Sequence, residues 1–144
     1  MINPKEFNIN EFTPVKATVG AIIEENRKVF LTKRSHTMEK ESGKWCIPGG
    51  HIEISETAEE ALKREVKEET NLSLRNIKFL GYQDEYLPKL KVHAINLIFS
   101  AGPYGKESLS NEVSEEKWFT KEETQKLDLA FKDKEIIKRF FNPK

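Results

Sequence analysis

Three glutamates and one arginine close together, at Arg64, Glu65, Glu68 and Glu69, are the residues best suited to carry chemistry. If residues 57–70 form a helix with about 100° between successive side chains, Glu65 and Glu69 fall inside its apolar arc, one turn apart. Glu68 lies at the edge of that arc, beside Arg64. Unpaired buried carboxylates are costly, and two stacked carboxylates repel each other. We therefore expect a positive partner beside them.

The type of ligand narrows what that partner can be. Oxygen ligands at this density suit a hard cation, Mg²⁺ or alternatively Mn²⁺, whereas zinc would favour His or Cys. Arg64 could hold one carboxylate in place, most simply that of Glu56 at the start of the helix. The alternative is an ordinary solvated helix, because the segment KREVKEE also matches surface pairs of glutamate and lysine. The helix alone leaves both interpretations open.

The helix that must position these carboxylates is the clearest element of the chain. Thr57 and Glu60 form a capping box, and apolar residues follow at helical spacing. Asn71 is expected to end the helix, because asparagine tolerates a positive φ. Upstream of the helix, Gly49 and Gly50 directly precede His51 and would let backbone atoms approach a ligand closely. The helix and the glycine pair thus form one candidate site.

The rest of the chain is predicted to alternate between strands and helices. We expect strands at residues 15–23, 29–32, 45–47, 72–82, 91–100 and 116–119, and further helices at residues 120–126 and 133–141. This order predicts an α/β (α+β) fold with a mixed sheet. Since the sequence shows no internal repeat and no Pro/Gly-rich linker, we expect residues 1–144 to form a single domain.

Composition excludes several classes of function. The chain has 144 residues with 24 basic and 24 acidic side chains, so its formal net charge is zero, which argues against a nucleic-acid binder. No apolar run approaches the roughly 18 residues of a membrane span, and no signal peptide is expected. The single cysteine, Cys46, excludes an intramolecular disulfide and a multi-cysteine zinc site. We expect a cytoplasmic protein that binds no membrane.

Residues 50–72 carry a longer pattern that includes both the glycine pair and the helix. It is matched by Gly50, Glu56, Arg64, Glu65, Val66, Glu68, Glu69 and Leu72. This segment resembles the Nudix box, G-x5-E-x7-R-E-U-x-E-E-x-G-U, where U is a bulky aliphatic residue. Asn71 replaces the late glycine, and Ser55 stands where many members have glycine. The resemblance extends more loosely over residues 14–142.

The resemblance implies both a fold and an activity. The implied fold is the Nudix α/β/α sandwich around a mixed sheet. The implied activity is Mg²⁺-dependent hydrolysis of a diphosphate bond in a nucleoside diphosphate joined to another group, such as a nucleoside triphosphate or ADP-ribose. The implied partner is a small nucleotide, and homodimers are frequent in the family. The alternative is a regulatory module of the same fold that senses a nucleotide without hydrolysing it.

By position in the box, roles can be carried over to this sequence. The resemblance implies Glu65, Glu68 and Glu69 as metal ligands, helped by a carbonyl of Gly49 or Gly50. Glu56 would be an outer ligand, and Arg64 would fix Glu56 and Glu65.

Residues outside the box are less sharply defined. A later loop offers Glu107, Glu112, Glu115 or Glu116 as general base, and we choose Glu112 over the alternative of a solvated charge. Lys33 and Arg34 are candidates for contact with phosphate, as are Gly49 and Gly50. An ordinary surface charge is the alternative for the two basic residues.

Overall fold

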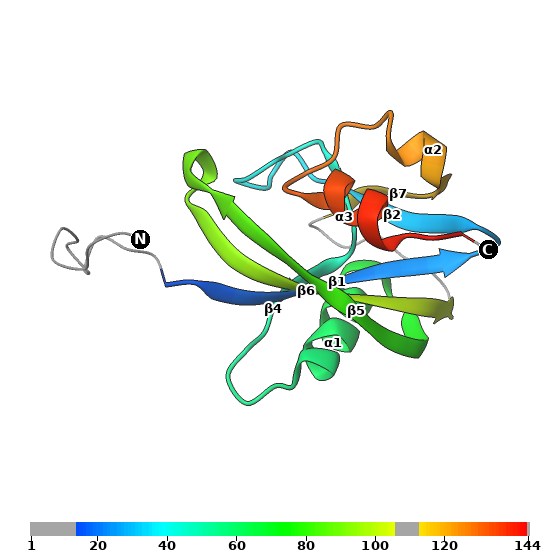
Figure 1. The fold of residues 1–144 in the computed structure, drawn as a ribbon, viewed down its shortest axis with the longest axis horizontal. Helices are drawn as coiled ribbons and strands as arrows, with labels where there is room; N and C mark the ends of the chain where they lie inside the picture. Colours follow the sequence, from blue (N-terminus) through cyan, green and yellow to red (C-terminus); the bar gives the residue numbers. More distant parts are fainter. Residues whose placement is uncertain (1–13, 106–112, 144) are drawn as a thin grey trace, which may run out of the picture.

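A mixed sheet of seven strands forms the centre of the molecule in the computed structural model, which describes residues 14–105 and 113–143 (Figure 1). The strands are β1 (Lys16–Glu25), β2 (Lys28–Arg34), β3 (Trp45–Cys46), β4 (Gly49–His51), β5 (Ser73–Leu87), β6 (Val92–Tyr104) and β7 (Val113–Thr120). The helices are α1 (Ala58–Thr70), α2 (Lys121–Thr124) and α3 (Asp133–Phe140), with a short 3-10 turn, η3 (Pro88–Leu90). The predicted fold class is confirmed.

Strand β1 lies at the centre of the sheet. The strand order is β3-β2-β1-β6-β5, with β4 also pairing with β1 and β7 with β2. Strands β1 and β6 run parallel, and the other pairs are antiparallel. Thr18 of β1 lies opposite both Asn96 of β6 and His51 of β4. One row across three strands therefore joins the centre of the sheet to the loop before α1.

Helices cover the two faces of the sheet and give three layers, with α1 on one side and α2 and α3 on the other (Figure 1). The alternation of strand β1 explains this arrangement. Val19 and Ile23 pack in the core beneath α1, with Leu62 and Val66. Ile22, which points to the opposite face, packs in a second core with α3. None of the helices in the described ranges is long and apolar enough to cross a membrane.

Both ends of α1 are fixed as the sequence predicts. The Thr57 hydroxyl accepts a hydrogen bond from the Glu60 amide at 3.2 Å. At the other end, Asn71 adopts a left-handed conformation with φ of 62°, and its amide donates to the Lys67 carbonyl at 2.9 Å. These caps set where the helix starts and stops, and so which side chains turn toward the sheet.

The sequence did not predict strand β4. It predicted a strand only over residues 45–47 in this part of the chain, whereas Gly49, Gly50 and His51 continue the sheet by pairing with β1. A Cβ on Gly49 would overlap the Val19 carbonyl oxygen and would lie 2.9 Å from the Gly20 Cα. Glycine is therefore required here because the two backbones approach so closely.

The lengths of several other elements also differ from those expected. Strand β5 continues to Leu87 and forms a long hairpin with β6, because cross-strand pairs persist well beyond residue 82. Strand β7 begins at Val113, earlier than predicted. Helix α2 is only a single turn, Lys121–Thr124, capped by the Thr120 hydroxyl. Local patterns fix the type of these elements, and long-range pairing fixes their ends.

Ser55, in the loop before α1, is predicted to be a site of backbone strain. Its φ is 73°, a region that serine enters only at a cost. We expect Ser55→Gly to raise the free energy of unfolding by up to about 1 kcal/mol. Urea unfolding curves of the native protein and of Ser55→Gly would measure this difference in the free energy of unfolding. Ser114→Gly, in strand β7, should instead lower the stability, and equal losses in both variants would contradict this account.

Candidate active site

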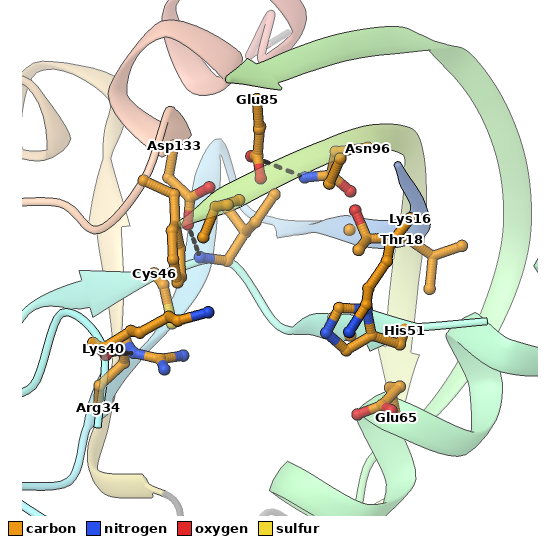
Figure 2. Close-up of a pocket in the computed structure, with 18 of the residues that line it drawn as sticks. Lys16, Thr18, Arg34, Lys40, Cys46, His51, Glu65, Glu85, Asn96 and Asp133 are labelled. Carbon is orange, nitrogen blue, oxygen red and sulfur yellow. Dashed lines mark hydrogen bonds between the residues drawn. The ribbon is translucent and has the colours of Figure 1, made fainter. Parts of the chain in front are cut away.

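An open cleft of about 390 Å³ lies over the centre of the sheet (Figure 2). Its walls come from strands β1, β2, β4 and β6, from α1, and from the segment that leads into α3. The glycine pair Gly49 and Gly50 and the carboxylates Glu65 and Glu69 line one end. Arg34 and Asp133 line another part of the same cleft. Residues distant in sequence thus share one concave surface.

Arg64 organises the acidic cluster at the α1 end of the cleft. Its guanidinium makes a two-pronged ion pair with Glu56, with Nε 2.6 Å from Oε2 and one terminal nitrogen 2.8 Å from Oε1. A terminal nitrogen also donates to the His51 carbonyl at 3.0 Å. The paired guanidinium lowers the pKa of the Glu56 carboxyl to about 2. Arg64 therefore ties the start of α1 to the glycine-bearing strand β4.

The same guanidinium contacts two carboxylates on its own helix. Arg64 lies 2.9 Å from Glu65 Oε1 and 3.3 Å from Glu68 Oε2. The Glu68 side chain remains 60% exposed, whereas that of Glu65 is 17% exposed. Glu69, one turn beyond Glu65, is buried. These exposures agree with the helical projection, which places Glu65 and Glu69 on the inward arc and Glu68 at its edge.

The Glu65 carboxylate lies directly against the backbone of Gly50. A Cβ at residue 50 would come within 2.6 Å of Glu65 Oε1. The absent side chain therefore leaves room for the carboxylate beside the Gly50 backbone. Glu69 lines the same end of the cleft. Carboxylate and backbone carbonyl oxygens gathered in one place are the donor set of a hard divalent cation.

In this structure, the acidic side chains at the α1 end of the cleft do not form a complete set of metal ligands. Within the described parts of the chain, no three His, Cys, Asp or Glu side chains lie together in a geometry that could hold a metal ion. Glu65 and Glu68 are turned onto Arg64 instead. The chemistry of the donors fits a cation. Binding one would require these two carboxylates to turn from the guanidinium.

A second set of buried polar groups lines the part of the cleft away from α1. The Asp133 carboxylate accepts a hydrogen bond from the Ile47 amide at 2.9 Å and is almost fully buried. Burial, together with the nearby Glu85 carboxyl, raises the pKa of Asp133 well above its usual range. Burial also raises the pKa of Glu85, against the opposing effect of its hydrogen bond from Asn96. These groups gain protons more readily than exposed acids do.

The two basic residues at the end of β2 point to different places. Arg34 lines the cleft, stacks over the Phe131 ring at 5.0 Å, and donates from Nε to the Lys40 carbonyl at 2.9 Å. Lys33 does not line the cleft and instead lies 3.9 Å from the Glu115 carboxylate. Successive residues of a strand face opposite sides, which accounts for the difference. The structure therefore brings only Arg34 to the candidate site.

None of the four candidates for the general base is placed in the cleft by the described residues. Glu107 and Glu112 fall outside the described residues. Glu115 and Glu116 belong to strand β7 and do not line the cleft.

Sequence reasoning missed several polar residues of the cleft wall, among them Thr18, Glu85, Asn96 and Asp133. A signal existed for Asn96, because it interrupts the apolar run HAINLIF. For the other three, the surroundings arise only when β1, β5 and α3 come together.

The raised pKa of Asp133 predicts a particular dependence of stability on pH. The native state holds this proton more tightly than the unfolded chain, so its ionisation lowers the free energy of unfolding as the pH rises above about 4. Asp133→Asn removes this loss and keeps an oxygen for the Ile47 amide. We expect the variant to gain stability over the native protein progressively toward neutral pH.

Urea unfolding at a series of pH values would measure this effect. Asp128→Asn is the matched control, because the Asp128 side chain is 80% exposed. Parallel stability profiles for the native protein and Asp133→Asn would contradict the account.

Comparisons with known proteins agree with this geometry. The NUDIX domain model matches residues 14–140. The chain is 34% identical over 123 residues to the ADP-ribose pyrophosphatase of Methanocaldococcus jannaschii, covering 85% of this chain and 70% of that protein. It is 30% identical over 124 residues to the nucleoside triphosphatase NudI of an Enterobacter species, covering 79% and 88%. The solved MutT protein from Methanosarcina mazei Go1 superposes with a TM-score of 0.76 at 25% identity, covering 88% and 93%.

The fold and the box residues therefore define a Nudix domain, and the chain belongs to the Nudix family. It is a Nudix pyrophosphohydrolase, an enzyme that acts on nucleoside diphosphate derivatives. Nudix hydrolases generally need a divalent metal ion. This requirement matches the oxygen donors gathered at the α1 end of the cleft.

Proposed function

We propose that this enzyme hydrolyses ADP-ribose to AMP and ribose 5-phosphate in a Mg²⁺-dependent reaction, with residues 1–144 acting as one catalytic domain. Water adds across the diphosphate bridge as one of its P–O bonds breaks, so that each product carries a phosphate. The observation that carries the proposal is the Arg64 cluster, in which the guanidinium pairs with Glu56 and Glu65 while the Glu65 carboxylate lies against Gly50 at the cleft. The similarity to an ADP-ribose pyrophosphatase supports the choice of substrate.

Glu65, Glu68 and Glu69 would hold the metal ion, with the Gly50 carbonyl as a further donor and Glu56 as an outer ligand. A bound Mg²⁺ supplies neutralisation of the diphosphate charge and a lower pKa for its water, with Mn²⁺ as an alternative. Glu69 is buried against the cleft and is a candidate to contact the ion from the helix. Each carboxylate contributes negative charge where the cation is needed.

The remaining residues act by position. Arg64 fixes the Glu56 carboxylate by two charge-assisted hydrogen bonds and so holds α1 in place relative to β4. Arg34, stacked on Phe131, is placed to contact a phosphate oxygen. Glu112 remains our candidate for the general base. We expect action in the cytoplasm on a free nucleotide, with neither nucleic acid nor membrane as partner, and we propose a homodimer.

Product analysis on a substrate panel tests this function. The panel contains ADP-ribose, ATP, an oxidised guanine nucleotide, NADH and a dinucleoside polyphosphate, each with Mg²⁺ and with EDTA. We expect ADP-ribose to give AMP and ribose 5-phosphate with kcat/KM at least about tenfold above the others, and only with Mg²⁺. A preference for a nucleoside triphosphate would refute the substrate assignment. Binding of ADP-ribose without turnover would favour a sensing role instead.

A further inference from the structure

Three polar side chains in the cleft, Thr18, Glu85 and Asn96, form a recess with unused hydrogen-bonding capacity. Asn96 and Glu85 are 7% and 6% exposed, and the Asn96 amide nitrogen donates to Glu85 Oε1 at 3.3 Å. The Asn96 Oδ1 and Thr18 Oγ1 atoms are buried, yet neither has a hydrogen-bond partner among the residues that the structure describes. Figure 2 shows Thr18 and Asn96 side by side, with Glu85 turned toward Asn96.

Unpartnered polar atoms of this kind are uncommon in folded proteins. A buried donor or acceptor left without a partner is costly, so native structures keep few of them. Both atoms belong to residues that line the open cleft rather than a closed core. A molecule that enters the cleft can therefore supply the missing partners.

The recess lies within reach of the acidic cluster. Asn96, Thr18 and His51 occupy one row across β6, β1 and β4, and two strand spacings amount to about 10 Å. Gly50 is next to His51, and the Glu65 carboxylate lies against the Gly50 backbone. A nucleotide whose diphosphate lies at Glu65 would therefore extend its attached group along this row toward Asn96.

The chemistry of the recess identifies what kind of group it accepts. Asn96 Oδ1 can only accept a hydrogen bond, and the Thr18 hydroxyl can donate or accept one. Glu85 adds a carboxyl group, and none of the three side chains carries a positive charge that could pair with a phosphate. The complementary ligand is uncharged and offers N–H or O–H donors.

We propose that Thr18, Glu85 and Asn96 bind the uncharged, donor-bearing part of the substrate and thereby select among nucleoside diphosphate derivatives. The shared chemistry is found in the amino edge of a nucleobase and in the hydroxyls of a ribose. This inference rests on the proposed function only in placing the diphosphate at the acidic cluster. It assigns the recess to specificity and assigns no part of the hydrolytic step to these side chains.

The test uses probes that lack a diphosphate bond and so cannot be hydrolysed: AMP, IMP and ribose 5-phosphate. Calorimetric titration would measure their affinities for the native protein, Thr18→Val and Asn96→Leu. We expect each variant to bind at least one of these probes about tenfold more weakly than the native protein does. Thr18→Val should keep or raise the melting temperature, because it removes an unpartnered hydroxyl. Ser100→Ala, on the same strand as Asn96 but outside the cleft, should change neither quantity.

The probes separate the two sources of donors. Recognition of the base amino group predicts that AMP binds more tightly than IMP and that only AMP loses affinity in the variants. Recognition of the ribose predicts equal losses for all three probes. The inference is overturned if Thr18→Val and Asn96→Leu bind every probe as tightly as the native protein, or if the native protein binds none. A native enzyme that fails to hydrolyse ADP-ribose refutes the proposed function, while a Thr18-dependent affinity for AMP would still support the recess.

Discussion

Glu69→Gln is expected to lower kcat for the preferred substrate by about 10³-fold while leaving the fold intact. The substitution keeps the shape of a side chain that is buried at the cleft but removes its negative charge. Because a divalent cation needs that charge, the variant should lose metal affinity and turnover together. Stability should hold or rise in the absence of metal, since a carboxylate no longer has to be buried.

Glu60→Gln is the matched control for this substitution. Glu60 is exposed on the outer side of the same helix, so its loss of charge should leave kcat within about twofold. Steady-state kinetics with saturating Mg²⁺ and thermal unfolding without it separate the effects on chemistry and on folding. Equal activity of Glu69→Gln and the native enzyme would remove the acidic cluster from the mechanism.

Alanine substitutions at two adjacent glycines are expected to have different effects, one on catalysis and the other on stability. A Cβ on Gly50 would overlap the Glu65 carboxylate, which is the mobile end of a side chain and can move aside. Gly50→Ala should therefore fold normally, yet a displacement of about 1 Å at a candidate ligand should lower kcat by about 10²-fold. The loss arises because the carboxylate can no longer rest against the strand.

Gly49→Ala should instead lose stability. A Cβ there would overlap the Val19 carbonyl oxygen, and a backbone atom cannot move aside without separating β4 from β1. We expect a loss of about 3 kcal/mol in the free energy of unfolding. Urea unfolding and steady-state kinetics on both variants would show the contrast. A stable, active Gly49→Ala protein or an unstable Gly50→Ala protein would contradict the geometry.

The sequence predicted the α1 end of the cleft well because its residues are local. Helical spacing alone places Glu65 and Glu69 on the inward side, and the caps at Thr57 and Asn71 fix the helix. Arg64 lies in the second turn of that helix, eight residues after Glu56, so their pairing also follows from short-range geometry.

The opposite part of the cleft could not be predicted in the same way. Glu85, Asn96 and Asp133 come from three elements that meet only through the β5-β6 hairpin and the packing of α3. The side-chain directions of Lys33 and Arg34 could not be predicted from the sequence either. Both are basic neighbours in sequence, but strand alternation sends one to the cleft and the other to Glu115. A prediction of that difference needs the register of β2 against the rest of the sheet.

Binding of a divalent ion at the acidic cluster is the central claim, and Mn²⁺ is the probe that tests it most directly. Electron paramagnetic resonance would count the Mn²⁺ bound by the native protein, by Glu69→Gln and by Glu60→Gln. We predict that the native protein and Glu60→Gln bind Mn²⁺ alike, and that Glu69→Gln binds it at least about tenfold more weakly. Mn²⁺ binding of equal strength by all three proteins would show that the metal lies elsewhere and would contradict the account.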